Sequence, residues 1–109
     1  GYIECGEELA ARDGVCVRRV ARFVEKPPLE RAREFLASGR FLWNGGIFVW
    51  RTRTLLEGLA RHRPELPRAF GAGALDAATF GALPSVAIDV ALMEPAAAEG
   101  RVLVVPIDY

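Results

Sequence analysis

The chain has 109 residues, enough for one modest domain and too few to favour two independent hydrophobic cores. Its 14 basic and 14 acidic side chains cancel, so no overall field directs it toward nucleic acid or an anionic membrane, and we expect neither as a partner. Hydrophobic residues make up 51% of the chain, yet no apolar run approaches the roughly 18 residues of a membrane helix.

The first part of the chain predicts a strand followed by a helix. β-branched residues from Val15 to Val24 indicate a strand, with an irregularity near residues 18–19. The prolines at 27–28 end this strand, because proline donates no hydrogen bond, and they precede a predicted helix from Leu29 to Ser38. Gly39 is suited to cap that helix in a left-handed conformation. The expected apolar face of the helix consists of Leu29, Ala32, Phe35 and Leu36.

Residues 41–50 form the least polar part of the sequence. An asparagine and two glycines divide it into a turn and a buried strand at residues 47–50. Thr52 is the expected N-cap of a helix over residues 53–63, which would cover that strand. The expected inward side of this helix consists of Leu55, Leu56, Leu59 and Ala60.

The remainder of the chain predicts short elements. Residues 65–81 indicate one or two short helices, and residues 86–93 another short helix. Residues 102–105 read as a second buried strand. This alternation of strands and helices favours an α/β or α+β layer arrangement.

No targeting segment is visible, and the chain starts at Gly1 rather than at Met, which suggests a truncated beginning. We expect a soluble, cytoplasmic protein. Cys5 and Cys16 have no CxxC spacing and His62 stands alone, so we expect inert reduced thiols and no metal ligands in this chain.

A carboxylate and an ammonium group, those of Glu25 and Lys26, stand side by side where the predicted strand ends. The proline at position 27 makes the backbone turn, so the strand end can present Glu25 to hydroxyl groups and Lys26 to a phosphate. The alternative is that both are solvated charges at the edge of a loop.

Two further polar residues are embedded in apolar surroundings. Asn44 precedes two glycines that allow close backbone approach, so its amide is suited to a sugar hydroxyl, or else it forms a plain Asn–Gly turn. Asp89 lies among apolar residues at the start of a predicted helix. There the alternative is helix capping by Asp89 or Ser85.

Four motifs together resemble one enzyme family. They are residues 1–4 (GYIE), 23–27 (FVEKP), 43–48 (WNGGIF) and 88–94 (IDVALME). Their order and approximate spacing resemble those of bacterial mannose-1-phosphate guanylyltransferases, and the resemblance covers essentially the whole chain. It implies a Rossmann-like α/β nucleotidyltransferase fold with a mixed sheet flanked by helices, of which residues 1–109 would be the sugar-phosphate-binding part.

The resemblance also implies a reaction and roles. A mannose 1-phosphate oxygen attacks the α-phosphorus of GTP with the help of Mg²⁺, which gives GDP-mannose and pyrophosphate. By resemblance, Gly1 and Tyr2 lie in a loop that approaches the sugar, Glu25 binds mannose hydroxyls, Lys26 meets the sugar phosphate as the catalytic cation, Asn44 contacts the sugar ring, and Asp89 supports the site.

The sequence departs from the family pattern in several places. The family's glycine-rich nucleotide loop normally lies upstream of Gly1, and its second metal-binding aspartate normally follows Asp108, so we assign no metal role to Asp108. Gly45, Val90 and Pro95 stand where the family often has Ser, Tyr and Lys. We therefore expect the isolated chain to be inactive.

Two other functions stay open on this sequence. One is a related nucleotidyltransferase that uses glucose 1-phosphate or another nucleotide, although the motif at residues 43–46 favours mannose. The other is a non-catalytic homologue that keeps the fold. A homodimer is also left open.

Overall fold

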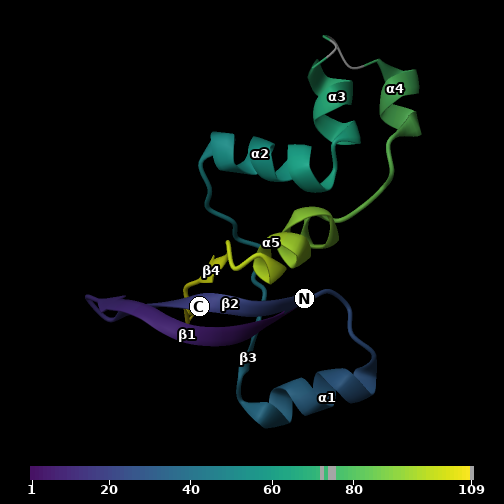
Figure 1. Cartoon of the computed structure of the whole chain (residues 1–109). Helices are drawn as coiled ribbons and strands as arrows, with labels where there is room; N and C mark the ends of the chain where they lie inside the picture. Colours follow the sequence, from purple (N-terminus) through teal and green to yellow (C-terminus); the bar gives the residue numbers. More distant parts are fainter. Residues whose placement is uncertain (72, 74–75, 109) are drawn as a thin grey trace.

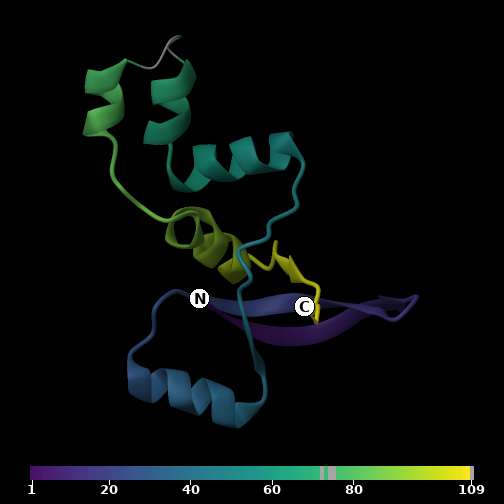
Figure 2. The ribbon, with the colours of Figure 1, turned by 180° about the vertical axis from the view of Figure 1, so that it is seen from behind.

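The computed structural model describes residues 1–71, 73 and 76–108. Its centre is a four-stranded sheet in the order β3-β1-β2-β4, and the three pairings are antiparallel. The strands are β1 (Tyr2–Arg12), β2 (Val15–Val24), β3 (Phe41–Trp43) and β4 (Leu103–Val104). Helices lie on both sides of the sheet, as Figures 1 and 2 show from opposite directions. The predicted α/β class with helices flanking a sheet is confirmed, but the described part of the sheet has antiparallel pairings only and is not mixed as predicted.

The long hairpin of β1 and β2 includes a strand that the sequence analysis did not predict. Much of β1 is made of Glu and Ala, which favour strands only weakly. Its pairing with β2, from Tyr2 opposite Val24 to Arg12 opposite Val15, holds it extended. The turn between the strands is Asp-Gly at residues 13–14, with φ of 52° and 79°, the sequence and backbone typical of a two-residue hairpin.

The irregularity predicted near residues 18–19 is confirmed. The register between the two strands shifts at Cys5, at Glu8 and before Ala10, on the part of β1 that faces residues 17–20. Such bulges bend and twist a hairpin. Its far end projects from the rest of the molecule in Figure 1.

The hydrophobic core lies between one face of the hairpin and the C-terminal helices. These helices are a π-helical turn, η1 (Asp89–Met93), continued directly by α5 (Glu94–Ala98). The core cluster consists of Ile3, Val20, Phe23, Met93 and Ala97, and Val20 is only 1% exposed. Apolar side chains of β2 and α5 thus hold the C-terminal helices over the sheet.

An aromatic cluster on the opposite face of the sheet holds α1 (Leu29–Ser38). The rings of Phe35 and Phe41 are stacked with centroids 3.9 Å apart, and Tyr2 meets Phe35 edge-on at 5.6 Å. The guanidinium of Arg22 lies 5.5 Å from the Phe35 ring centroid. Helix α1 has the predicted bounds and the predicted left-handed cap, Gly39, with φ of 66°.

The predicted apolar face of α1 is only partly covered. Phe35 is buried, whereas Leu29 and Leu36 are 66% and 56% exposed. The apolar side chains expected on one face of α1 are therefore only partly packed against the rest of the described chain, through Phe35 and its aromatic neighbours.

The buried strand predicted at residues 47–50 is wrong. The strand is Phe41–Trp43, three residues long, and residues 44–51 belong to no strand, with a bend at Gly46. Ile47 and Val49 are 71% and 95% exposed. An apolar composition predicts an extended segment, but a strand also needs a neighbouring strand to receive its hydrogen bonds.

Helix α2 (Thr52–His62) follows this segment. The predicted N-cap, Thr52, is instead the first helical residue, and Arg51 is the N-cap without a side-chain bond. Leu55 and Leu59 are half-buried as predicted, but Leu56 and Ala60 are exposed. With no strand at residues 47–50, the prediction that α2 covers one is also wrong.

Residues 65–81 contain the predicted short helices, α3 (Glu65–Gly71) and α4 (Ala77–Ala82). Residues 72, 74 and 75 of this stretch lie outside the described residues. The carboxylate of Asp76 caps α4 by accepting a bond from the Thr79 backbone N–H at 2.7 Å.

The last two predicted elements differ in extent. The helix predicted at 86–93 begins later, at Asp89, and continues to Ala98 as η1 and α5. The strand predicted at 102–105 is reduced to Leu103–Val104. Leu103 and Val105 are 53% and 44% exposed, so that strand is not buried. The sheet does not extend beyond β4 in the described chain, so only one edge of that strand is paired.

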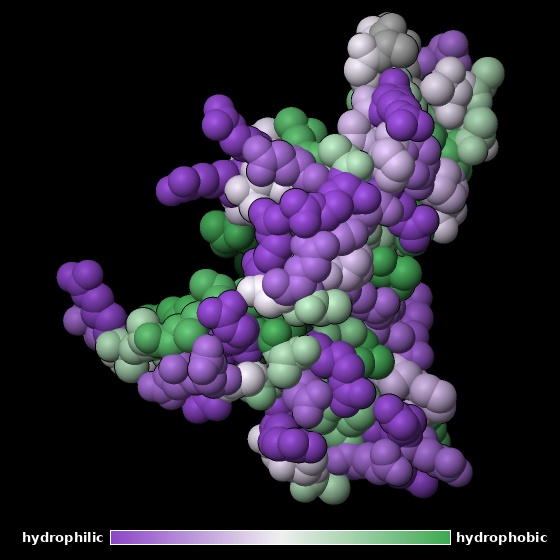
Figure 3. Space-filling model, in the orientation of Figure 1, coloured by the Kyte–Doolittle hydropathy of each residue, from purple (hydrophilic) through white to green (hydrophobic). Residues whose placement is uncertain are grey.

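On the surface, apolar patches alternate with polar ones, and Figure 3 shows apolar patches along the hairpin and between the helices. Among the described residues, no helix is both long and apolar enough to cross a lipid bilayer.

Candidate functional site

Three strand ends meet at one edge of the sheet. Because β1 runs antiparallel to both β2 and β3, its first residue lies beside the last residues of its two neighbours. Gly1 therefore lies next to Glu25, which follows β2, and next to Asn44, which follows β3. The backbone N–H of Asn44 donates to the Gly1 carbonyl at 3.0 Å.

The Glu25 carboxylate lies between two nitrogen atoms. Its Oε2 is 3.3 Å from the nitrogen of Gly1, and its Oε1 is 3.9 Å from Lys26 Nζ. The Glu25 side chain is 16% exposed. A Cβ on Gly1 would lie 2.8 Å from Glu25 Oε2, so a residue without a side chain lets this carboxylate sit against the backbone.

Lys26 is the single lysine of the chain, and its side chain is 87% exposed. The backbone turns at this residue, as predicted from the following proline, with φ of 46°. Positive φ is uncommon for a residue with a side chain, and such conformations often occur at functional sites. The turn directs an ammonium group into solvent beside a carboxylate, which suits a ligand with both hydroxyls and a phosphate.

Asn44 and Asp89, which are 45 residues apart in the sequence, are joined by a hydrogen bond. Asn44 Nδ2 donates to Asp89 Oδ1 at 2.8 Å, and Asn44 Oδ1 accepts from the Gly46 backbone N–H at 3.0 Å. These two bonds fix the orientation of the amide and leave it one N–H and one lone pair. The Asn–Gly turn that the sequence left open is present. Helix capping by Asp89 or Ser85 is wrong, because Ile88 is the N-cap of η1 without a side-chain bond, and Asp89 contacts Asn44 instead.

Tyr2 differs from its predicted placement. It is the first residue of β1 rather than part of a loop. Neighbouring strand residues point to opposite faces, so Tyr2 faces α1 while Ile3 enters the core. The Tyr2 ring packs on Phe35 and Trp43, with centroid distances of 5.6 Å and 6.5 Å.

Sequence reasoning did not single out Glu94, which also contacts the site. Its Oε1 accepts a hydrogen bond from the Glu25 backbone N–H at 3.0 Å. The contacts given above therefore form one continuous chain. It begins at Asp89, passes through Asn44, Gly1 and Glu25, and ends at Glu94. The only signal in the sequence is that Glu94 lies in the same motif as Asp89, five residues later.

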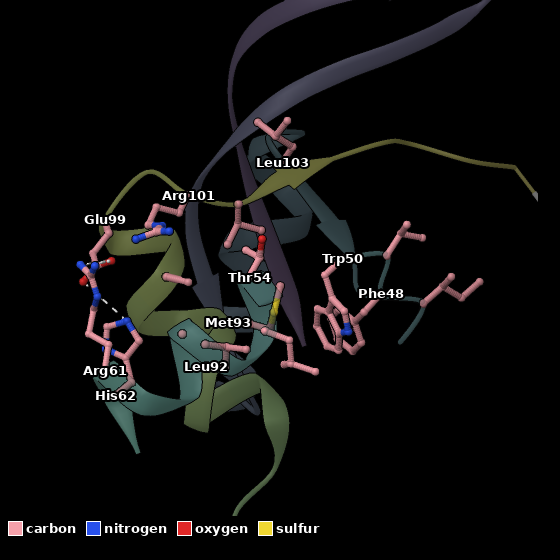
Figure 4. A pocket seen from close by; sticks show the side chains of 16 residues that line it. Phe48, Trp50, Thr54, Arg61, His62, Leu92, Met93, Glu99, Arg101 and Leu103 are labelled. Carbon is pink, nitrogen blue, oxygen red and sulfur yellow. Dashed lines mark hydrogen bonds and ion pairs between the residues drawn. The ribbon is translucent and has the colours of Figure 1, made fainter. Parts of the chain in front are cut away.

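A separate cavity of about 330 Å³ lies between α2, the segment at residues 47–50 and the C-terminal helices. Figure 4 shows Phe48 and Trp50 on one side and Arg61, His62 and Glu99 on the other. The two aromatic rings are stacked with centroids 5.4 Å apart, and His62 Nε2 is 3.5 Å from Glu99 Oε1. None of the predicted site residues lines this cavity.

The described residues do not fit a Mg²⁺ site. Within residues 1–71, 73 and 76–108, no three His, Cys, Asp or Glu side chains are grouped to hold a metal ion. Asp89 already accepts the bond from Asn44, and the Glu25 carboxylate lies beside the Lys26 ammonium group. We therefore derive no step through a metal from this chain.

Both cysteines are free thiols. Burial raises the pKa of the Cys5 thiol, against the opposing effect of nearby Arg18. A raised pKa lowers the thiolate fraction, and the thiolate is the reactive form. This agrees with the expectation that Cys5 is inert.

Comparison with known proteins assigns the family. The sequence model of the nucleotidyl transferase family matches residues 1–81, so the chain belongs to this family. It is 37% identical over 119 residues to a mannose-1-phosphate guanylyltransferase of Escherichia coli strain K12, covering 99% of this chain. It is 40% identical over 118 residues to the alginate biosynthesis protein AlgA of Pseudomonas aeruginosa, covering 98% of this chain.

The xanthan biosynthesis protein XanB of Xanthomonas campestris is 37% identical over 119 residues, covering 99% of this chain. In all three comparisons the chain spans only 24% of the relative's length. No solved structure matches this chain significantly.

Proposed function

We propose that the protein carrying this chain is a mannose-1-phosphate guanylyltransferase, which transfers GMP from GTP to mannose 1-phosphate. The observation that carries the proposal is the 37–40% identity, over nearly the whole chain, to relatives that include a protein of this name. The strand-end contacts among Gly1, Glu25, Asn44 and Asp89 support it, because they bring together groups from all four motifs.

In this proposal residues 1–109 form a partial nucleotidyltransferase domain that binds the sugar phosphate. The Glu25 carboxylate accepts hydrogen bonds from mannose hydroxyls, and the remaining N–H of Asn44 contacts the sugar ring. Gly1 leaves room for the sugar beside Glu25. Tyr2, through its aromatic contacts, keeps the start of β1 in place, and Asp89 holds Asn44.

Lys26 is the proposed catalytic residue. An oxygen of the mannose 1-phosphate phosphate attacks the α-phosphorus of GTP, the bond from the α-phosphorus to the bridging β-phosphate oxygen breaks, and pyrophosphate leaves. The Lys26 ammonium lowers the repulsion between the two anions and positions the attacking phosphate. This mechanism needs no covalent enzyme intermediate.

We further propose that the complete protein uses Mg²⁺ held by residues outside this chain, works in the cytoplasm and can form a homodimer. The isolated 109 residues are then expected to have no guanylyltransferase activity. Turnover of GTP and mannose 1-phosphate by the isolated chain would contradict this division of roles.

The test measures pyrophosphate release by the full-length protein with GTP, Mg²⁺ and either mannose 1-phosphate or glucose 1-phosphate. Glu25→Gln and Lys26→Ala are expected to lose most of the mannose-dependent rate, with Lys26→Arg intermediate. The matched controls Glu30→Gln and Arg33→Ala change exposed residues of α1 and should keep it. A glucose preference would indicate the related enzyme, and absence of turnover a non-catalytic homologue.

A further inference from the structure

Glu94 is half-buried, and its carboxylate contacts a backbone N–H of the site rather than one of the site's side chains. Its Oε1 accepts the Glu25 backbone N–H at 3.0 Å, across 69 residues of sequence. This amide lies just past the end of β2, where the strand ladder no longer supplies a carbonyl. In Figure 1 the C-terminal helices lie beside the start of β1, which allows this contact.

The bond lies one residue before a backbone position of positive φ. Lys26 has φ of 46° and precedes Pro27, which restricts the residue before it. Such a conformation is energetically costly and persists only when neighbouring contacts hold it. The hydrogen bond from the Glu25 backbone N–H to the Glu94 carboxylate is one of the contacts that hold this turn.

The π-helical turn lets the side chains of Asp89 and Glu94 contact the same site. The Glu94 backbone N–H donates to the Asp89 carbonyl, five residues earlier. In an α-helix of 3.6 residues per turn, residues five apart would point about 140° away from each other. The wider π turn reduces this angle, since its hydrogen bonds join residues i and i+5.

Pro95 disfavours a regular α-helix here. It has no N–H to donate to Ala91, the bond that an α-helix would require, and its ring would crowd that carbonyl. π turns inside helices are frequent at functional sites. Here the turn lets one short segment hold Asn44 through Asp89 and Glu25 through Glu94.

We propose that Glu94 is a positioning residue, and that with Asp89 it sets the separation of the Asn44 amide from the Glu25–Lys26 turn through one π turn. Its role in substrate binding rests on the function proposed above. Glu94 itself contacts only backbone in this site, so it acts through Glu25 and Lys26. It affects the binding of the sugar phosphate rather than the binding of the nucleotide.

The kinetic test uses Glu94→Ala and Glu94→Gln in the full-length protein. Glu94→Ala is expected to raise the KM for mannose 1-phosphate about tenfold and to leave the KM for GTP within about twofold, as expected for a lost bond of about 1.4 kcal/mol. Glu94→Gln keeps an acceptor oxygen and should recover most of the loss. An equal rise in both KM values, an unchanged KM, or a Glu94→Gln variant as impaired as Glu94→Ala would overturn the proposal.

A second measurement tests the contact without relying on the reaction. Amide hydrogen exchange of the peptide around residues 24–26 should be faster in Glu94→Ala and close to the original rate in Glu94→Gln. Exchange in α4 should be unchanged in both, which excludes global unfolding. Unchanged exchange at Glu25 in Glu94→Ala overturns the positioning role even if the protein is active. If the protein does not turn over mannose 1-phosphate, the proposed function fails while this exchange experiment still decides the role of Glu94.

Discussion

Replacing Asp89 with alanine removes the acceptor of the 2.8 Å hydrogen bond from Asn44 Nδ2. A hydrogen bond to a charged group contributes about 1.5–3 kcal/mol. Both side chains are half-buried, and the Gly46 N–H still holds Asn44 Oδ1 at 3.0 Å, so the lower end of this range applies. If the Asn44 amide contacts the sugar, Asp89→Ala should raise the KM for mannose 1-phosphate about tenfold.

The assay is the initial rate of pyrophosphate release by the full-length protein at varied mannose 1-phosphate and saturating GTP. A double-mutant cycle adds Asn44→Ala and the double variant, because the cycle isolates the contribution of the pair. Asp89→Ala should have little further effect once Asn44 is alanine. Asp76→Ala, which removes a carboxylate at the cap of α4, is the control and should leave the KM unchanged.

Two results would refute this reasoning. One is a KM for mannose 1-phosphate that Asp89→Ala does not change, and the other is a double variant whose loss is the sum of the two single losses. Additive losses would mean that Asp89 and Asn44 act independently, so their hydrogen bond would not be the route by which Asp89 supports the site.

Two further predictions concern stability. Gly58→Ala places a Cβ 2.7 Å from Leu92 Cδ1, where α2 packs on η1. The crowding costs about 1–3 kcal/mol, whereas the gain in helix propensity is roughly 1 kcal/mol. The substitution should therefore lower the Tm. Gly81→Ala in α4 meets nothing within 4 Å and should not lower the Tm in the same fluorescence melts; equal shifts would contradict the packing argument. The backbone N–H of Thr79 lowers the pKa of Asp76 below its ordinary 3.8, so the stabilisation by this cap is present above that pH and is lost as the pH falls through the lowered pKa. The Tm difference between the unaltered protein and Asp76→Ala should therefore shrink below pH 3.8, and a constant difference would count against the cap.

The local parts of the fold could be predicted from neighbouring residues. Helix α1 has the predicted bounds because Pro28 precedes it and Gly39 ends it, and both act within one turn of chain. The Asp-Gly turn at residues 13–14 is an equally local signal for the hairpin. Strand β1 was nevertheless not predicted, because its glutamates and alanines favour strands only weakly.

The elements that were predicted wrongly depend on distant partners. Residues 47–50 are as apolar as a buried strand, yet no strand of the described chain pairs with them. The exposed leucines of α1 and α2 show the same limit, because periodicity predicts which side of a helix is apolar but not whether another element covers it.

The sequence by itself singled out the polar groups proposed for the candidate site except Glu94, because Glu25, Lys26, Asn44 and Asp89 stand out as polar residues in apolar surroundings or at a strand end. Only the tertiary structure decided how they meet. Antiparallel pairing brings Gly1 beside Glu25 and Asn44, and the π turn adds Glu94. Contacts across 45 and 69 residues depend on strand order and helix register, which are properties of the packed chain and not of any local run of residues.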